Sequence, residues 1–404
     1  MFVRFFQKKR MFFCLKRKPY VKNKFIKEVR KMKFSCETSL FTSAVSAALR
    51  AVTSKSSLAT LEGILIRTNH DEIILSGYDL EIAIQTVIPA SVEIEGCTVI
   101  NAKILYDILR KLPEDRVTIE IADNNKAYIT SGSSEFSIIA LDANEYPELP
   151  ELEEKNEISI PADILQSMIS QTIFAVSTSD ERPIYKGVLF QINGDEIKTV
   201  AMDGCRLAIR KENIADTGRE FEFVVPAKAL QEVLKMIGEE ETSDVKIEVS
   251  RRHICFAKEN YTMISRLIDG IFLDYTTPAI IPPEEQTVVI ADTREMLSLI
   301  ERISLIIVER LKSPVRCTYK DNEIFMRCST IMGKASDFLS VDGEGDEQEI
   351  GFNGRFFTDA LRAVDCDKVK IVFNGPQRPI KILPLEGDDF LFIVVPVIMK
   401  AEPK

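Results

Sequence analysis

The chain has 404 residues, of which 45% are hydrophobic and 28% are charged, and its formal charge at pH 7 is −10. This length exceeds what one hydrophobic core supports and fits two to four domains. No stretch approaches the ~18 consecutive apolar residues that a membrane-spanning helix needs, which excludes a helical membrane protein.

Residues 1–31 differ in charge from the rest of the chain. They hold twelve Lys and Arg residues against the single acid Glu28, a charge of +11, so residues 32–404 carry −10 − 11 = −21. No apolar core follows these basic residues, which argues against a secretory signal. We expect Met32 to be the native start and residues 1–31 to be non-native or disordered. A basic nucleic-acid arm and a membrane-surface segment are the alternatives.

Two strand–helix units recur in the same order along residues 32–404. The first, an alternating strand that leads into an amphipathic helix, is predicted at 33–52, 157–176 and 288–307. The second is predicted at 99–112, 224–237 and 350–364. Its first two copies share an Ala-Lys pair, and Ala227 lies 227 − 102 = 125 residues after Ala102.

Strand segments recur as well. A hairpin pattern is shared by 63–84 and 187–209, and a further strand pattern by 136–150, 263–278 and, more loosely, 382–396. A period this long excludes a solenoid, whose repeats have ~20–50 residues. Alternating apolar and polar residues favour antiparallel sheets, and two helices per copy make the predicted class α+β. Predicted linkers at 148–157 and 280–286 give domains at 32–152, 153–282 and 283–404.

The residues that common catalytic mechanisms need are missing. His70 and His253 have no partner at metal-ligand spacing. No phosphate-binding loop, dinucleotide fingerprint or nucleophile elbow occurs. The eight cysteines form no C-x-x-C pair, which predicts reduced thiols. The acidic segment 335–349 lacks EF-hand spacing and is predicted to be a solvated loop. We therefore expect no catalytic residues, no metal site and no cofactor.

Four ordered segments carry a family resemblance: MKF at 32–34, TVAMDGCRLAI at 199–209, GFNGRFF at 351–357 and FIVVPVIM at 392–399. Together with the triplication, they resemble the beta subunit of bacterial DNA polymerase III, the DNA sliding clamp. The resemblance implies three clamp domains whose head-to-tail homodimer surrounds duplex DNA as a ring, with sheets outside and helices lining the hole. It also implies a cytoplasmic, nucleoid-associated processivity factor that is not an enzyme. The implied lining helices lie near 38–52, 102–112, 162–175, 227–237, 294–309 and 355–364.

The resemblance implies that a few cations on this acidic ring face DNA without sequence preference. Extensive phosphate neutralisation would hold DNA in place, so a sparse set of cations suits sliding. Lys55 lies where the family usually carries a DNA-contacting basic residue, and Arg266 is a further candidate. The candidates on the implied helices are Arg50, Lys103, Arg110, Lys111, Lys228, Lys235 and Arg362. A solvated surface charge is the alternative for each of them.

The resemblance also implies an apolar groove between the second and third domains, into which polymerase and clamp-loader subunits insert a short peptide motif. Arg182 and Arg206 would bond peptide carbonyls or an acidic group, and apolar side chains would be buried by the peptide. Core packing is the alternative for Leu207, Ile393 and Val395. The candidate groove residues are Arg182, Tyr185, Met202, Gly204, Cys205, Arg206, Leu207, Leu273, Thr277, Pro278, Asn353, Phe356, Pro379, Ile393, Val395, Pro396 and Val397.

Some groove positions depart from the family pattern, and these departures bear on peptide specificity. Cys205 replaces a common His, Thr277 and Pro278 replace a basic and an apolar residue, and Ile398 replaces a frequent basic residue.

The ring contact implied by the resemblance joins the first domain of one protomer to the third domain of the other. Its candidates are Lys103, Tyr106, Ile306 and Ile307, with the predicted helix at 296–311 and a strand near 127–138. Such a head-to-tail contact closes on itself in a dimer.

Two other functions remain open. A metal-dependent nuclease would use Asp79, Asp203 and Asp269, which recur with the repeat, since 203 − 79 = 124 and Asp142 matches Asp269. Turn residues explain this recurrence more simply. A divergent clamp copy with a specialised role is the second alternative.

Overall fold

The computed structural model describes residues 30–152, 156–238, 243–307 and 313–399. Nearly all of the predicted leader lies outside these residues, although Arg30 and Lys31 belong to the first strand. Within the described residues the chain forms three consecutive α+β domains with open antiparallel sheets, which confirms the predicted fold class. No helix in this part of the chain is long and apolar enough to cross a bilayer.

The first domain contains helices α1 (Thr38–Leu49) and α2 (Ala102–Leu109). Its strands are β1 (Arg30–Glu37), β2 (Gly63–Asn69), β3 (Glu72–Tyr78), β4 (Ile82–Pro89), β5 (Ser91–Ile94), β6 (Cys97–Asn101), β7 (Arg116–Ala122), β8 (Lys126–Ser131) and β9 (Ser134–Leu141). Helix α1 buries Phe41, Val45 and Ala48, which recur at the spacing of one helical face. Helix α2 begins where the side chain of Asn101 accepts a hydrogen bond from the N–H of Ile104.

The second domain repeats this order with α3 (Ala162–Ser170) and α4 (Ala227–Ile237). Its strands are β10 (Asn156–Pro161), β11 (Gly187–Asn193), β12 (Glu196–Met202), β13 (Arg206–Asn213), β14 (Glu220–Pro226), β15 (Asp244–Val249), β16 (His253–Lys258) and β17 (Tyr261–Arg266). Each helix directly follows a proline, Pro161 or Pro226, that ends the preceding strand. The fixed φ of proline suits this boundary between strand and helix.

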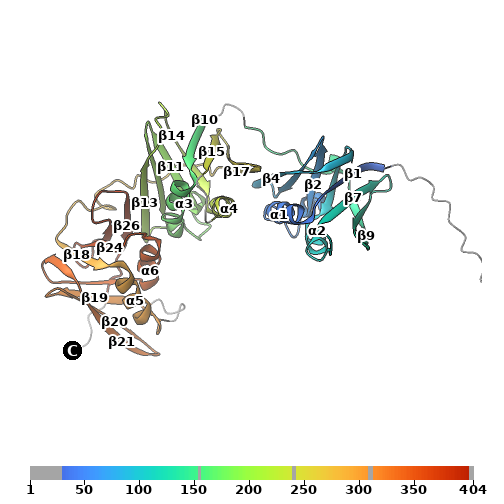
Figure 1. Ribbon diagram of the computed structural model, residues 1–404. Helices are drawn as coiled ribbons and strands as arrows, with labels where there is room; N and C mark the ends of the chain where they lie inside the picture. Colours follow the sequence, from blue (N-terminus) through green and yellow to red (C-terminus); the bar gives the residue numbers. More distant parts are fainter. Residues whose placement is uncertain (1–29, 153–155, 239–242, 308–312, 400–404) are drawn as a thin grey trace, which may run out of the picture.

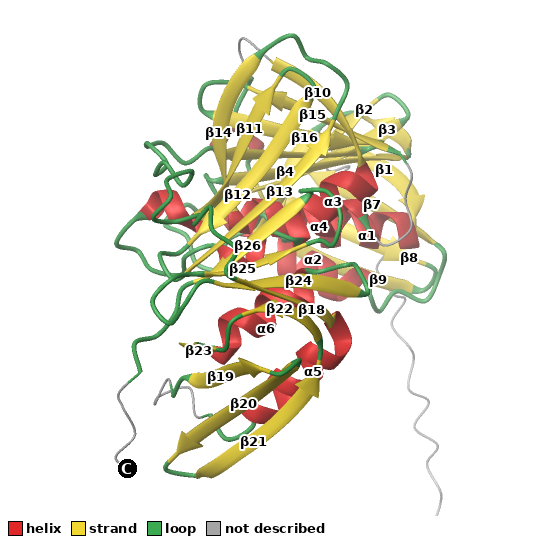
Figure 2. Cartoon of the chain, turned by 90° about the vertical axis from the view of Figure 1, so that its left-hand side faces the viewer, coloured by secondary structure: helices red, strands yellow, loops and turns green. Residues whose placement is uncertain are grey.

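The third domain contains α5 (Thr293–Ser304) and α6 (Gly354–Ala363). Its strands are β18 (Thr287–Asp292), β19 (Val315–Lys320), β20 (Glu323–Thr330), β21 (Gly333–Ser340), β22 (Asp342–Gly345), β23 (Gln348–Phe352), β24 (Lys368–Phe373), β25 (Ile380–Leu383) and β26 (Phe390–Val394). Helix α5 contacts both β20–β21 and β18, so it is packed between two sheets (Figure 2).

The predicted segment 335–349 is not a loop, and that prediction was wrong. Strand β21, β22 and the start of β23 occupy it. Ala335 and Leu339 lie on the half-buried face of β21 and pack against the core, while Phe338 on the other face is exposed. The prediction of a loop relied on the acidic residues of this segment and overlooked its alternation of exposed and half-buried positions, which is typical of a strand.

Four predicted helices extended too far. The helices expected to reach 52, 112 and 175 end at Leu49, Leu109 and Ser170, the last followed by a separate 3-10 turn. The helix expected to reach 309 ends at Ser304, and residues 308–312 lie outside the described residues. The residues that follow each helix also pack against the core, so the apolar spacing in the sequence extends beyond the end of the helix.

Two sheets cross the domain boundaries. Strand β4 pairs antiparallel with β17, and β13 pairs antiparallel with β26, where Leu207 lies opposite Ile393. One shared sheet therefore contains β6-β2-β3-β4-β17-β16-β15-β10, and the other contains β14-β11-β12-β13-β26-β25-β24-β18-β22. Figure 1 shows the result: the three domains follow an arc, with sheets on its convex side and the six labelled helices toward its concave side.

The second junction also has an aromatic core. Phe392 of β26 is fully buried, and its ring meets Phe174 of the second domain edge-on, with ring centroids 5.3 Å apart. Strand pairing and this aromatic contact together fix the third domain against the second.

We expect Phe392→Ala to lower the free energy of unfolding by about 3–5 kcal/mol, because it leaves a cavity at the domain junction. Urea unfolding followed by circular dichroism measures the effect. Leu385→Ala is the matched control, since Leu385 is 45% exposed in the same domain. Equal unfolding midpoints for the two variants would contradict the junction core.

Candidate functional site

Four predicted groove residues meet in one apolar cluster at the junction of the second and third domains. Met202 and Leu207 come from β12 and β13, Ile393 lies opposite Leu207 on β26, and Tyr185 belongs to the 3-10 turn before β11. Leu207 is 2% exposed and Ile393 is 1% exposed. These two side chains therefore form the packed floor of the junction rather than its open surface.

Other predicted groove residues lie at the surface near this floor. Leu273 is 46% exposed, Val395 39% and Val397 37%. The C-terminal segment is fixed there, because the N–H of Val395 donates to the carbonyl of Cys205 at 2.9 Å and that of Val397 to Gly351 at 2.7 Å. Of the remaining candidates, Arg182, Gly204, Cys205 and Pro278 are exposed, Thr277, Asn353, Phe356 and Pro396 are half-buried, and Pro379 is buried.

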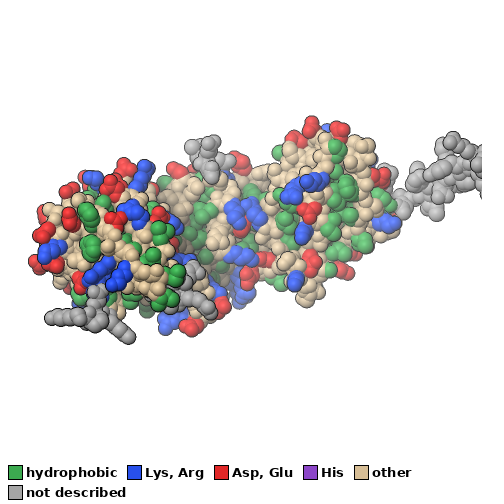
Figure 3. Space-filling model, turned by 90° about the horizontal axis from the view of Figure 1, so that it is seen from below, with side chains coloured by type: hydrophobic (Ala, Val, Ile, Leu, Met, Phe, Trp, Pro, Cys, Tyr) green, Lys and Arg blue, Asp and Glu red, His purple; other side chains and the backbone are tan. Residues whose placement is uncertain are grey.

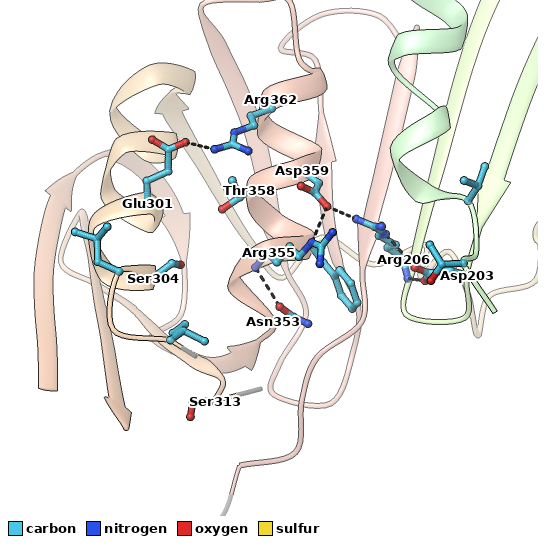
Figure 4. A pocket seen from close by; sticks show the side chains of 15 residues that line it. Asp203, Arg206, Glu301, Ser304, Ser313, Asn353, Arg355, Thr358, Asp359 and Arg362 are labelled. Carbon is cyan, nitrogen blue, oxygen red and sulfur yellow. Dashed lines mark hydrogen bonds and ion pairs between the residues drawn. The ribbon is translucent and has the colours of Figure 1, made fainter. Parts of the chain in front are cut away.

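The guanidinium of Arg206 is held inside the junction. Nε donates to Oδ2 of Asp203 at 3.0 Å, and Nη1 donates to Oδ2 of Asp359 on α6 at 2.6 Å (Figure 4). The guanidinium lies 4.7 Å from the ring centre of Phe356 and 5.7 Å from that of Phe174. Arg206 thus joins the two domains through a carboxylate and a ring from each. Nothing in the sequence marks Asp359 for this role, because it lies 153 positions from its partner.

A cavity of about 980 Å³ adjoins this network, and three predicted groove residues, Arg206, Asn353 and Phe356, line it. Figure 4 shows the rest of its wall, where Arg362 of α6 pairs with Glu301 of α5 at 2.7 Å. The side chain of Asn353 accepts a hydrogen bond from the N–H of Arg355 and so caps α6. The cavity and the apolar cluster share the second-to-third domain junction, which makes this junction the candidate partner site.

Eight of the nine predicted DNA-facing cations lie on or near helices of the concave side, whereas Arg266 ends strand β17. Figure 3 views the arc from this side and shows Lys and Arg side chains on all three domains, among acidic and apolar ones. Lys55, Lys103, Lys111 and Arg266 are exposed and form no ion pair with the residues that the structure describes.

The other five candidates are paired with carboxylates. The partners are Glu232 for Arg50 and Lys235, Asp79 for Lys228, Asp107 for Arg110 and Glu301 for Arg362. Arg50 and Lys228 cross from one domain to the other: Arg50 Nη2 also donates to the hydroxyl of Tyr261 at 3.0 Å, and Lys228 Nζ lies 2.5 Å from Asp79 Oδ2. These two cations therefore tie the first domain to the second.

The predicted dimer residues lie in the first and third domains, at the two ends of the arc. Lys103 is exposed on α2, and Tyr106 packs half-buried against the core of the first domain. Ile306 and Ile307 follow α5 and pack half-buried against the core of the third domain, while the neighbouring Leu305 is 83% exposed. The strand expected near 127–138 is the hairpin of β8 and β9.

Asp79 and Asp203 of the nuclease alternative occupy equivalent turns, whereas Asp269 lies in the segment after β17. Oδ1 of Asp79 accepts a hydrogen bond from the N–H of Ile82 at 2.7 Å, and Oδ1 of Asp203 accepts the equivalent bond from Arg206 at 3.1 Å. The repeated aspartate therefore reflects a repeated turn. In the described parts of the chain, no group of three or more His, Cys, Asp and Glu side chains could hold a metal ion.

The cysteines differ in accessibility. Burial raises the pKa of Cys36 and of Cys317 to about 12, so neither thiol ionises near neutral pH. Cys205, in the turn between β12 and β13, and Cys97, at the start of β6, are exposed. Cys205 is therefore an accessible thiol at the edge of the candidate partner site.

Three family models match the chain in succession. They are the N-terminal, central and C-terminal domains of the DNA polymerase III beta subunit, at residues 32–150, 159–274 and 278–398. The beta sliding clamp of Bacillus subtilis (strain 168) is 33% identical over 378 residues, covering 91% of this chain and 99% of the relative. The beta sliding clamp of Staphylococcus aureus is 31% identical over 376 residues, with 91% and 99% covered.

Solved structures agree with this match. The DNA polymerase sliding clamp from Bacillus subtilis superimposes with a TM-score of 0.88 at 32% identity, covering 92% of this chain and all (100%) of that one. A putative DNA polymerase III beta subunit from Eubacterium rectale gives 0.86 at 32% identity, with 91% and 99% covered. The chain belongs to the family of the DNA polymerase III beta subunit, the bacterial beta sliding clamps.

Proposed function

We propose that the chain encircles duplex DNA as a closed head-to-tail dimer and tethers a DNA polymerase to it. The domain limits 32–152, 153–282 and 283–404, and a cytoplasmic location at the nucleoid, belong to the same proposal. The observation that carries it is the order of strands in the sheets. Both domain junctions follow one pairing rule, and among the described residues that rule leaves β21 at one end of the arc and most of β9 at the other with an open edge.

Equivalent strands of the three domains show this rule. Each domain contains two three-stranded meanders. The first meander ends at β4, β13 or β21, and the second ends at β9, β17 or β26. Strand β4 pairs with β17, and β13 pairs with β26. In the described chain β21 has a free edge, and residues 134–139 of β9 pair with β8 alone. A second copy would pair its β21 with this β9, and the reciprocal pair would close the ring.

Apolar side chains gather at these two free edges. Ile139 of β9 is 76% exposed, Phe338 of β21 is 58% exposed and Phe325 of β20 is 41% exposed. Exposed apolar side chains beside an open strand edge are typical of a surface that another chain covers. The carbonyl of Ile306 accepts a hydrogen bond from Thr330 on β20, so this residue lies beside the same edge. We assign Lys103, Tyr106, Ile306 and Ile307 to the flanks of this contact.

We expect Phe338→Asp to convert a dimer into a monomer, because the contact would bury an unpaired carboxylate. Sedimentation velocity at about 5 µM protein measures the change. Leu385→Asp is the control and stays dimeric, since Leu385 is an exposed residue of the same domain away from β21. A monomeric parent protein, or a dimeric Phe338→Asp variant, would contradict the proposed ring.

The concave side would face the DNA. The body carries −21, and carboxylates of the described residues pair with five of the nine predicted DNA-facing cations, so the attraction to DNA would be weak and non-specific and would let a closed ring slide. Lys55, Lys103 and Lys111 are exposed and unpaired among the described residues, so they are the strongest candidates for phosphate contacts. Arg110, which pairs only loosely with Asp107 at 3.8 Å, is the next. Arg50, Lys228, Lys235 and Arg362 contribute less, because carboxylates already neutralise them.

Retention on circular DNA tests the function directly. After loading by a bacterial clamp loader, we expect the protein to stay with a nicked circular plasmid during gel filtration and to leave when the plasmid is cut. Lys55→Glu should lower the loaded fraction about threefold, because a phosphate contact becomes a repulsion. Lys368→Glu, on the exposed end of β24, serves as the control. Retention on linear DNA equal to that on circular DNA would exclude a topological link.

The candidate partner site would receive a short apolar peptide from a polymerase or clamp-loader subunit. Exposed Leu273, Val395 and Val397 offer apolar surface around a floor that is already packed. Two carboxylates already hold the Arg206 guanidinium in the junction, so Arg182, which is exposed, is the better donor to a peptide carbonyl. The remaining predicted groove residues stay candidates for the rim and floor of this site.

A thiol reagent can report occupancy of this site. We expect a peptide from the clamp-binding segment of a bacterial polymerase to slow labelling of Cys205 about tenfold and to leave Cys97 unaffected. Val395→Ala should weaken peptide binding about fivefold through lost apolar contact, and Leu385→Ala should not. Labelling of Cys205 at an unchanged rate under saturating peptide would refute this location. Leu207→Ala is less informative, because Leu207 is buried and its loss also weakens the fold.

A further inference from the structure

A second cavity opens beside the loop that contributes Leu273 to the candidate partner site. Its volume is about 370 Å³, and three arginines, Arg251, Arg252 and Arg266, line it. The first two lie in the turn between β15 and β16, and Arg266 ends β17. His253, the first residue of β16, pairs with Arg266 in the sheet. The two strand ends therefore bring the three guanidiniums together.

The cavity is positively charged in an acidic body. The three arginines are exposed and form no ion pair with described residues. Two carboxylates, Glu222 and Asp269, also line the cavity, and Glu222 already accepts a hydrogen bond from the amide of Gln191 at 3.0 Å. Three guanidiniums against two carboxylates leave a positive balance, while residues 32–404 as a whole carry −21.

The neighbouring histidine is consistent with this positive balance. Burial lowers the pKa of His253, and the charges of Arg266 and Arg252 lower it further. Positive charge close to an imidazole disfavours its protonated form.

The arginine cavity is continuous with the apolar cluster of the partner site. Leu189 and Val224 line the cavity and belong to that cluster, and Phe272 lines the cavity and packs against the cluster. Ile271, next to Phe272, is 96% exposed. The loop 269–273 therefore borders the cavity through Phe272 and reaches the partner site through Leu273.

The arginine cavity also lies on the same rim of the arc as the partner site. The N–H of Arg266 donates to the carbonyl of Glu81, in the turn between β3 and β4. That turn is equivalent to the turn between β12 and β13, which carries Cys205 at the partner site. The same strand pairing joins successive domains, so equivalent turns lie on one rim of the arc.

We propose that this cavity binds carboxylate side chains that flank the apolar motif of the partner peptide. The inference rests on the proposed partner site and adds a charge requirement to it. Guanidinium groups bind carboxylates through paired, charge-assisted hydrogen bonds. DNA phosphates are the other possible anions, but a phosphate backbone leaves the half-buried apolar side chains of Ile268 and Phe272, which line the cavity, without a partner. A peptide with apolar and acidic residues matches both walls.

Two synthetic peptides test the proposal. Both carry the same apolar clamp-binding segment of a bacterial polymerase, followed by four Glu residues in one and four Gln residues in the other. We expect fluorescence anisotropy at about 50 mM salt to show about fivefold tighter binding of the Glu peptide. Arg251→Gln with Arg252→Gln should abolish this preference and leave the affinity for the Gln peptide unchanged. Lys246→Gln, an exposed residue of β15 outside the cavity, should preserve the preference.

The same measurements distinguish failure of the acidic-flank proposal from failure of the partner site. Equal affinity of the parent protein for the two peptides would overturn the acidic-flank proposal and leave the partner site standing. Failure of both peptides to bind would overturn the partner site, and this inference with it. An unchanged Glu preference in the double arginine variant, together with lower retention on nicked circular plasmid, would assign the arginines to DNA.

Discussion

Antiparallel pairing between strands of neighbouring domains is the interaction on which the rest of this structure depends. The 13-stranded and 9-stranded sheets each contain strands of two domains, and β4–β17 and β13–β26 are the pairs that cross the boundaries. Backbone hydrogen bonds fix direction and register, so each domain is set against the next by the same geometry. The arc, its helix-lined concave side and the two open edges at its ends all follow from this repeated pairing.

Charge distribution follows the same geometry. The strand pairing brings α4 of the second domain beside the end of α1, and there Arg50 and Lys228 meet Glu232 and Asp79 across the boundary. Arg50 and Lys228, which the sequence predicts to face DNA, therefore also join the first domain to the second. Of the predicted DNA-facing lysines, Lys55, Lys103 and Lys111 are unpaired among the described residues, so the proposed acidic ring would hold DNA by enclosure rather than by affinity.

The junction of the second and third domains combines rigidity with accessible surface. Leu207, Ile393 and Phe392 are buried there, and the Arg206 network joins the domains beside them. Val395 and the turn of Cys205 remain accessible around this fixed floor. A partner site on a rigid junction needs little rearrangement on binding, which lowers the entropic cost of docking a short peptide. The proposed role of the neighbouring arginine cavity would add recognition of carboxylates to this apolar surface.

Residue patterns alone predict the triplication, the α+β class, the helix starts and the family resemblance. These depend on local periodicity, on caps such as Asn101 and Asn353, and on motifs within single segments. The folded chain is needed to show that Arg206 binds Asp359, that Leu207 is buried in the packed floor, and that Arg251 and Arg252 line one cavity with Arg266. Such contacts join side chains from different strands or domains, so they depend on how sheets pair across a boundary, which no local pattern records.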